Sequence, residues 1–182
     1  MSGGYEVIYA DFPWPYTSFG TAKLPYNSMS TEEISDFDWS KWASKRCLIF
    51  SWATCPMLEV AIGCGLKWRE QGFSFQGVPY IWVKTKQDGT PIKASGPRPR
   101  LVKPLDEMIL AYSNAGNQRT FPLLLESQVQ HVFEPKPKRG EHSKKPGIFR
   151  DLIVNLVGDR PRIELFARER VAGWDAWGDE LP

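Results

Sequence analysis

The sequence predicts an α/β protein with an open sheet, formed by a single domain that covers residues 1–182. Apolar runs of strand length alternate with stretches of helical spacing, and this alternation favours a sheet covered by helices. A length of 182 residues suits one hydrophobic core. No internal repeat, low-complexity tract or linker divides the sequence.

Five segments have the composition of buried or partly buried strands. They read YEVIYA (5–10), RCLIFSWAT (46–54), FSFQGVPYIWVKT (73–85), LDEMILAYSN (105–114) and RIELFA (162–167). A glycine and a proline at positions 77 and 79 predict a bend in the third of them. A sixth strand is expected at the start of residues 129–146, and a polar tail follows residue 167.

Three segments carry helix signals between these strands. Ser30 and Glu33 have the spacing of a capping box, which predicts a short helix beginning after Ser30. Residues 56–72 have helical spacing, with a proline near the start and a glycine at the end. Residues 147–158 form an amphipathic pattern that also ends at a glycine.

The charge of the chain does not by itself indicate a nucleic-acid-binding protein. The formal net charge is only +2, so such a role must depend on local basic patches. Residues 86–103 and 134–145 are predicted surface loops with five basic residues each. These are Lys86, Lys93, Arg98, Arg100 and Lys103, then Lys136, Lys138, Arg139, Lys144 and Lys145. Solvated loop charge is the usual explanation, but beside a base pocket we favour contacts with phosphates.

The cysteine and histidine content argues against a metal site. Cys47, Cys55 and Cys64 form no C-x-x-C pair, and the chain has only two histidines. Reduced thiols are typical of a cytosolic protein. Neither a signal-peptide pattern nor an apolar run of membrane-spanning length is present, so we expect a cytoplasmic protein without membrane contact.

The stretch YADFPWPY places Asp11 directly after a predicted buried strand and beside two prolines. The exocyclic amine of a base is a poor nucleophile because its lone pair is delocalised into the ring. A carboxylate and a backbone carbonyl that accept its two hydrogens favour the reactive, pyramidal form, and prolines would fix these acceptors in advance. Asp11 and the Phe12 carbonyl are therefore candidate acceptors, with Trp14 as a surface for stacking the base. Taken alone, the pattern also fits a turn-capping aspartate and a core tryptophan.

The turn DFPW resembles the D-P-P-W motif of methyltransferases that act on the amino group of adenine. Further segments resemble one branch of them, the family named after the seventy-kilodalton subunit of mRNA adenosine methyltransferase. The segments, in the family's order, are YADFPWPY, LPYNSMSTEEI, IWVKTK, LDEMILAY, HSKKPGIF and IELFAR, followed by GWDAWGDEL. Since they extend over nearly the whole chain, the resemblance is far more specific than a lone D-x-P-W.

The resemblance implies a Rossmann-like fold that uses S-adenosylmethionine, with the catalytic motif before the cofactor motif. By position, the catalytic residues would be Asp11, Phe12, Pro13 and Trp14. The substrate-binding residues would be Tyr16, Tyr26, Lys84, Arg98 and Arg100. The cofactor-binding residues would be Ala10, Asp11, Ser143, Lys145, Glu164, Phe166 and Arg168. No metal is expected.

Within this set, the resemblance implies that Lys145 approaches the methionine end of the cofactor. Glu164 and Arg168 would hold the ribose hydroxyls and the cofactor rim, as a strand-end carboxylate does in dinucleotide folds. A carboxylate inside the apolar run RIELFA is costly unless it binds something, which supports this role for Glu164. Lys84 also fits a strand-end charge, Tyr26 fits core packing nearly as well, and Lys145 fits one more charge in a basic loop.

The sequence therefore predicts methylation of the N6 amine of adenine in DNA, in a bacterium or a phage-infected host cell. DNA is favoured over RNA because the chain resembles the compact prokaryotic and phage members of the family. RNA methylation, a catalytically inactive nucleic-acid-binding subunit and a small-molecule amine methyltransferase are the alternatives. Phe12, where proline is usual, and the acids Asp179 and Glu180, where amides are usual, keep the inactive subunit open. A homodimer or a related partner subunit is also compatible with the sequence.

Overall fold

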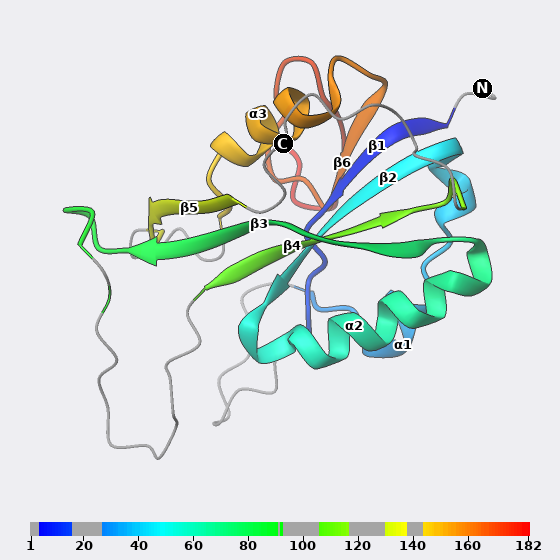
Figure 1. Cartoon of the computed structure of the whole chain (residues 1–182), viewed down its shortest axis with the longest axis horizontal. Helices are drawn as coiled ribbons and strands as arrows, with labels where there is room; N and C mark the ends of the chain where they lie inside the picture. The colour runs from blue at the N-terminus through cyan, green and yellow to red at the C-terminus, as the bar shows by residue number, and fades with distance from the viewer. Residues whose placement is uncertain (1–3, 16–26, 91, 93–105, 117–129, 138–143) are drawn as a thin grey trace.

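The computed structural model describes residues 4–15, 27–90, 92, 106–116, 130–137 and 144–182 (Figure 1). Its strands are β1 (Tyr5–Ala10), β2 (Ala43–Thr54), β3 (Ser74–Thr85), β4 (Glu107–Ser113), β5 (Gln130–Pro135), β6 (Arg162–Leu165) and β7 (Asp175–Trp177). Its helices are α1 (Thr31–Ser35), α2 (Leu58–Lys67) and α3 (Ile148–Val157), with short 3-10 turns η1 (Trp39–Lys41), η2 (Cys55–Met57) and η3 (Trp68–Gln71). None of the helices in this part of the chain is long and apolar enough to cross a membrane.

The seven described strands form one sheet in the order β5-β3-β4-β2-β1-β6-β7. β1 pairs in parallel with β2 and β6, β6 with β7, and β3 with β5. Only β4, within this sheet, runs antiparallel to both of its neighbours, β2 and β3. The carboxyl ends of the other six strands and the amino end of β4 therefore meet at one edge, which we call the carboxyl edge.

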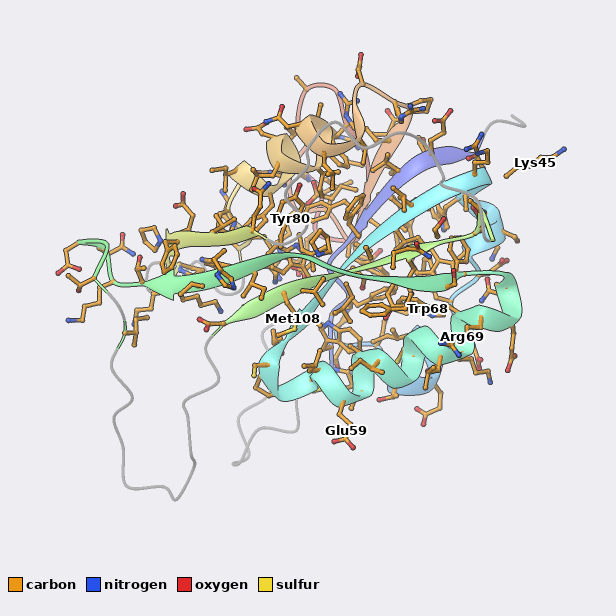
Figure 2. All side chains as sticks on the ribbon, in the orientation of Figure 1. Lys45, Glu59, Trp68, Arg69, Tyr80 and Met108 are labelled. Atoms are coloured by element: carbon orange, nitrogen blue, oxygen red, sulfur yellow. The ribbon has the colours of Figure 1, made fainter. Side chains whose placement is uncertain are left out.

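The helices cover both faces of the sheet and create two layers of core (Figure 1). One layer, beneath α1, α2 and η3, contains Ile8, Ile49, Trp68 and Leu110. The other layer, beneath α3, contains Phe50, Trp52, Tyr80, Trp82, Ile109, Phe149 and Ile153. Trp68 and Tyr80 mark the opposite faces (Figure 2). Because both faces are covered, the buried stretches of the central strands are mainly apolar, which is why they appear in the sequence as apolar runs rather than alternating ones.

Most local signals in the sequence correspond to the structure. The capping box is formed: the Glu33 amide donates to Ser30 Oγ, and the Ser30 amide donates to the Glu33 carboxylate. The bend in β3 is present as two register shifts around Gly77, whose φ is 127°. The predicted helix 56–72 is a shorter α2 flanked by η2 and η3, and Gly72 ends it in a left-handed conformation.

Among the differences from the sequence expectation are two strand ends and one additional strand. β6 ends at Leu165, two residues before the predicted end, because Phe166 turns out of the strand with φ of 60°. β5 continues to Pro135, so the first two residues of the predicted loop 134–145 are strand. The expected polar tail contains a further strand, β7, which pairs in parallel with β6.

Candidate active site

The turn after β1 is held in place by three backbone hydrogen bonds. The Asp11 amide donates to the Leu165 carbonyl at the end of β6, at 3.5 Å. The Trp14 amide donates to the Phe12 carbonyl at 2.9 Å, and the Met29 amide donates to the Pro13 carbonyl, also at 2.9 Å. The turn is thus fixed to β6 on one side and to the residue before the α1 cap on the other.

Four side chains form a carboxylate–lysine cluster at the carboxyl edge: Asp11, Lys84, Glu107 and Lys145. Lys145 Nζ lies 2.8 Å from Asp11 Oδ2 and 3.1 Å from Glu107 Oε2. Lys84 Nζ donates a hydrogen bond to Glu107 Oε1, on the other oxygen of the same carboxylate. Two carboxylates and two ammonium groups therefore alternate, and their formal charges cancel.

The cluster is largely removed from water. The side chains of Glu107 and Lys145 are 6% and 10% exposed, and those of Lys84 and Asp11 are 16% and 21% exposed. The lysines also lie over aromatic rings, Lys145 at 5.4 Å from the centroid of Trp52. At such burial, ion pairs persist only when each charge has a partner, as these do.

Burial and neighbouring charges shift the acids of the cluster in opposite directions. Burial raises the pKa of Asp11, and Lys145 only partly offsets this rise. Burial would also raise the pKa of Glu107, but the two lysines outweigh it and hold that pKa below its ordinary value. Burial would lower the pKa of Lys145, whereas Asp11 and Glu107 raise it, so this lysine is firmly protonated. Asp11 is therefore the carboxylate of the cluster that takes up a proton more readily than an ordinary aspartate.

Glu107 is a functional candidate that the sequence did not reveal. It is the first residue of β4, and because β4 is antiparallel, its amino end lies where the neighbouring strands end. Glu107 pairs directly with Trp82 on β3, which brings it close to Lys84. The acid at the start of an apolar run was visible in LDEMILAY, but the direction of that strand was not.

The two aromatic rings of the turn are part of the core. Phe12 is 2% exposed and packs against Phe37, Trp39, Trp68 and Phe166, with centroid distances of 4.8 to 5.9 Å. Phe12 can thus contribute to a site only through its backbone, whose carbonyl already accepts from the Trp14 amide.

Trp14 is also 2% exposed, and its indole N–H donates to the Trp52 carbonyl at 3.2 Å. Most of the Trp14 ring is therefore covered, and a base could stack only on a part of the ring that stays accessible. That role stays a prediction.

Glu164, on β6, is held by an arginine that was not singled out from the sequence. Arg150, on α3, donates from Nε to Oε2 at 2.6 Å and from a terminal nitrogen to Oε1 at 3.1 Å. Burial raises the pKa of Glu164, and Arg150 opposes the rise. Arg150 offsets the cost of burying this carboxylate, and cofactor binding by Glu164 stays a prediction.

Other predicted cofactor residues lie beside Glu164. Phe166 has a positive φ of 60°, a conformation that costs a non-glycine residue about 1–3 kcal/mol and that occurs preferentially at functional sites. Arg168 Nε lies 3.2 Å from Glu180 Oε2, so one of the two acids that replace the usual amides neutralises this arginine. Ala10, the last residue of β1, is fully buried. The predicted residues Tyr16, Tyr26, Arg98, Arg100 and Ser143 lie outside the described part of the chain.

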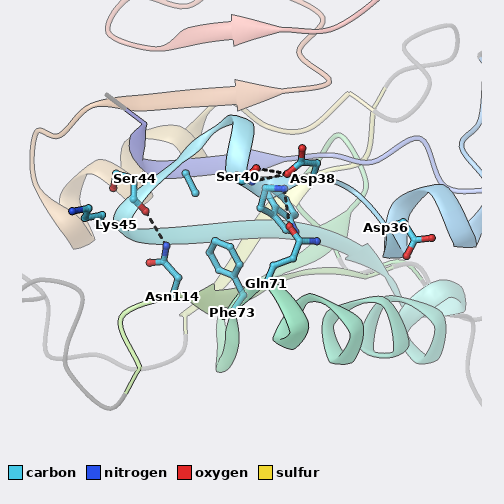
Figure 3. Close-up of a pocket in the computed structure, with 10 residues that line it drawn as sticks. Asp36, Asp38, Ser40, Ser44, Lys45, Gln71, Phe73 and Asn114 are labelled. Atoms are coloured by element: carbon cyan, nitrogen blue, oxygen red, sulfur yellow. Dashed lines mark hydrogen bonds between the residues drawn. The ribbon is translucent and has the colours of Figure 1, made fainter. Parts of the chain in front are cut away.

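A cavity of about 630 Å³ lies at the opposite edge of the sheet, between the start of β2 and η3 (Figure 3). Its polar side chains largely satisfy one another or the backbone. Gln71 accepts from the Trp39 amide and donates to the Phe37 carbonyl, while Asn114 accepts from the Cys47 amide and donates to the Ser44 carbonyl. Gln71 and Asn114 therefore stabilise the fold. The groups that are suited to catalysis lie at the carboxyl edge instead.

Comparison with known proteins identifies the family of this chain. The MT-A70 family matches residues 5–180, which is nearly the whole chain. Together with this match, the α/β sheet and the acid turn at its edge define the fold as that of S-adenosylmethionine-dependent methyltransferases. The chain belongs to the MT-A70 family, and the resemblance noted in the sequence is confirmed.

Curated relatives of this chain include a type II methyltransferase and two RNA methyltransferases. It is 26% identical over 199 residues to the type II methyltransferase M.MunI of a Mycoplasma species, a match that covers 98% of this chain and 78% of the relative. It is 29% identical over 189 residues to the N6-methyladenosine RNA methyltransferase MTA1 of Pyricularia oryzae, covering 97% of this chain and 47% of the relative. The MTA1 protein of Cryphonectria parasitica is 26% identical over 187 residues, with 97% and 52% covered. The chain thus spans about half the length of the two fungal relatives.

Proposed function

We propose that this methyltransferase binds S-adenosylmethionine at the carboxyl edge and methylates the N6 amine of adenine in DNA. The observation that carries the proposal is the half-buried Asp11 carboxylate, held by Lys145 in a turn that is itself tied to β6. It presents an acceptor at the edge of an α/β sheet where ligands of such folds bind.

One unsatisfied polar atom at this edge fits a polar ligand. Thr85 Oγ1 is buried without a hydrogen-bond partner in the described part of the chain, whereas Glu107 Oε2 is paired with Lys145 at 3.1 Å. Thr85 is the last residue of β3, and Glu107 is the first of β4. Buried polar atoms are rarely left unpaired in proteins, so the Thr85 hydroxyl supports a polar ligand beside the cluster.

The side chains at the carboxyl edge also fit the chemical groups of S-adenosylmethionine. Glu164 would accept from the ribose hydroxyls, Phe166 and Arg168 would line the rim, and Lys145 would approach the methionine carboxylate. Bound S-adenosylmethionine supplies an electrophilic methyl group. The protein supplies the orientation of the amine that receives it, and positioning of this kind can provide much of the rate.

Asp11 would act on the adenine amine by accepting one of its hydrogens. Its ion pair with Lys145 uses Oδ2, so Oδ1 can accept from the substrate. The Phe12 carbonyl accepts one hydrogen bond from the Trp14 amide and has a second lone pair for the other amine hydrogen. After methyl transfer the amine must lose a proton, and the raised pKa of Asp11 suits this carboxylate to accept it.

The choice of DNA is supported by the lengths of the matched regions. The match covers 78% of the type II methyltransferase but about half of each fungal RNA methyltransferase. An adenine in a duplex must be flipped out of the stack, or taken from a single strand, to reach a site at a sheet edge. Apart from Lys145, which is held in the cluster, the basic residues of 86–103 and 134–145 would contact the phosphates, and a second copy or a related subunit would extend that surface.

The substrate is tested by incubating the protein with radiolabelled S-adenosylmethionine and DNA or RNA oligonucleotides of the same base sequence. We expect label in DNA, recovered as N6-methyladenine after digestion, and none with the Asp11→Ala variant. Label confined to RNA would replace the DNA proposal with RNA methylation. A protein that neither binds the cofactor nor transfers label would be an inactive subunit of this fold.

Replacing Glu164 by alanine is expected to weaken cofactor affinity by about 1–3 kcal/mol, the range for hydrogen bonds to a charged group. The measurement is isothermal titration calorimetry with S-adenosylhomocysteine. Glu6→Ala is a matched control, because Glu6 is also paired with an arginine, Arg160, but lies at the amino end of β1. An unchanged dissociation constant for the Glu164 variant would remove this residue from the site.

We expect activity to be lost on acidification, and at a higher pH than if an ordinary aspartate were the acceptor. The acceptor role requires ionised Asp11, and burial raises its pKa, so kcat/KM is lost as the pH falls through this raised value. Lys145→Gln removes the cation that partly offsets the rise, so its residual activity is expected to decline at a still higher pH. A pH–rate profile without an acid limb in both proteins would contradict the assignment.

A further inference from the structure

Arg150 holds both oxygens of Glu164 in a two-pronged pair between α3 and β6. The two distances are 2.6 and 3.1 Å, and each side chain is only 11% exposed. A third nitrogen of the guanidinium donates to Glu169 Oε1 at 3.2 Å. With three directional bonds, the guanidinium is fixed in one orientation, and the plane of the Glu164 carboxylate is fixed with it.

The charges that surround Glu164 make Arg150 important for its ionisation. Tyr9 on β1, Asp11 after β1 and Glu169 after β6 all lie close enough to interact electrostatically with this pair. Burial raises the pKa of Glu164, and Asp11 and Glu169 push it further in the same direction. Arg150 is the cation that opposes these effects.

The ion pair leaves the carboxylate able to bind a ligand. Each carboxylate oxygen can accept about two hydrogen bonds, and Arg150 uses one on each. An ionised, oriented carboxylate is a strong acceptor for two neighbouring hydroxyl groups, whereas a protonated one would itself donate on one side.

A second contact ties this pair to the segment that carries Lys145. Lys144 Nζ lies 3.5 Å from Glu169 Oε2, and Glu169 in turn contacts Arg150. The neighbouring Lys145 contacts Asp11 and Glu107 in the cluster. Two adjacent lysines thus contact both groups at the carboxyl edge. Lys144 reaches the Arg150–Glu164 pair through Glu169, and Lys145 is itself part of the carboxylate–lysine cluster.

We propose that Arg150 is a positioning residue that keeps Glu164 ionised and oriented to accept the vicinal hydroxyls of the cofactor ribose. This inference rests on the proposed use of S-adenosylmethionine at the carboxyl edge. It adds a residue that contacts no part of the cofactor and acts only through Glu164.

The test compares S-adenosylhomocysteine binding by calorimetry across a range of pH for the wild type, Arg150→Met and Arg150→Lys. For Arg150→Met we expect affinity to fall roughly tenfold or more at neutral pH, the scale of a lost charge-assisted hydrogen bond. Loss of the cation raises the pKa of Glu164 further, so binding by this variant should decline at a higher pH than in the wild type as the solution is acidified. Arg150→Lys retains the charge but cannot donate to both carboxylate oxygens in the same way, and its pH profile should shift less than that of Arg150→Met.

Arg160→Met is the matched control, because Arg160 also extends from the α3–β6 region to a carboxylate, that of Glu6, at the amino end of β1. It should leave both affinity and pH profile unchanged. A folded Arg150→Met protein with wild-type affinity and pH profile would overturn the inference while leaving the proposed function intact. A wild-type protein that releases no heat with S-adenosylhomocysteine would overturn the proposed function and this inference together.

A double variant covers the case in which Arg150→Met does not fold. Arg150→Met combined with Glu164→Gln leaves no uncompensated buried carboxylate at this position. If Arg150 acts only through Glu164, the double variant should bind with the affinity of Glu164→Gln alone and with the same pH profile. If the double variant bound S-adenosylhomocysteine roughly tenfold more weakly than Glu164→Gln alone, Arg150 would have an independent role and the inference would be overturned.

Discussion

Replacing Asp11 by alanine is expected to reduce turnover by about a hundredfold or more, the usual cost of removing one preorganised polar group from an active site. The structural reason is that Asp11 is held by Lys145 and by its own backbone bond to β6, so its carboxylate is oriented in advance. Cofactor affinity should change by only a few-fold, because Glu164 and Arg168 are unaffected. Turnover is measured by single-turnover labelling of DNA, and affinity by calorimetry with S-adenosylhomocysteine.

Two further variants separate catalysis from general damage. Asp11→Asn keeps the size of the side chain and should lose most of the activity as well, because a neutral amide is a weaker acceptor than a carboxylate. Asp38→Ala removes an acid that pairs with Lys41 far from the carboxyl edge, and it should leave turnover unchanged. Turnover within a few-fold of wild type in Asp11→Ala would eliminate this residue as the acceptor.

Replacing Glu107 by glutamine is expected to reduce the free energy of unfolding by about 3–5 kcal/mol, the cost of breaking a buried ion pair on one side. The change leaves Lys84 and Lys145 facing a neutral amide in a region with little access to water. Urea unfolding followed by tryptophan fluorescence measures this loss. Asp36→Asn is a matched control on an exposed pair with Lys67 and should cost less than about 1 kcal/mol.

The dependence on pH distinguishes charge from packing in this experiment. The lysines hold the pKa of Glu107 below its ordinary value, so its stabilising contribution is present above the unfolded-state pKa and is lost as the pH falls through the lower folded-state value. The difference between wild type and Glu107→Gln should therefore shrink on acidification. Combining Glu107→Gln with Lys84→Met removes one uncompensated lysine and should restore much of the stability. A difference below about 1 kcal/mol at neutral pH would mean that the cluster does not stabilise the fold.

The elements that local pattern specifies were predictable from the sequence. Buried strands such as 5–10 appear as apolar runs because both faces of the sheet are covered. The capping box at Ser30 was predictable because its two hydrogen bonds involve residues only three apart. The family resemblance, confirmed by the match over residues 5–180, identified the class of enzyme.

The features that depend on distant pairing were not predictable. An apolar run does not reveal strand direction, and the reversed β4 is what brings Glu107 to the carboxyl edge. β7 is only three residues long and acquires its strand geometry from β6 rather than from its own sequence. Arg150 and Glu164 are 14 positions apart on different elements, so no local rule connects them. The assigned roles of the site residues remain predictions for the experiments above.

The aromatic ring of Phe12 has a consequence for how the enzyme responds to heat. A proline at this position would restrict the backbone through its own covalent ring, whatever surrounds it. Phe12 restricts it only while Phe37, Trp68 and Phe166 remain packed around it. Loosening of that aromatic layer on warming would therefore free the Phe12 backbone, which a proline would keep restricted.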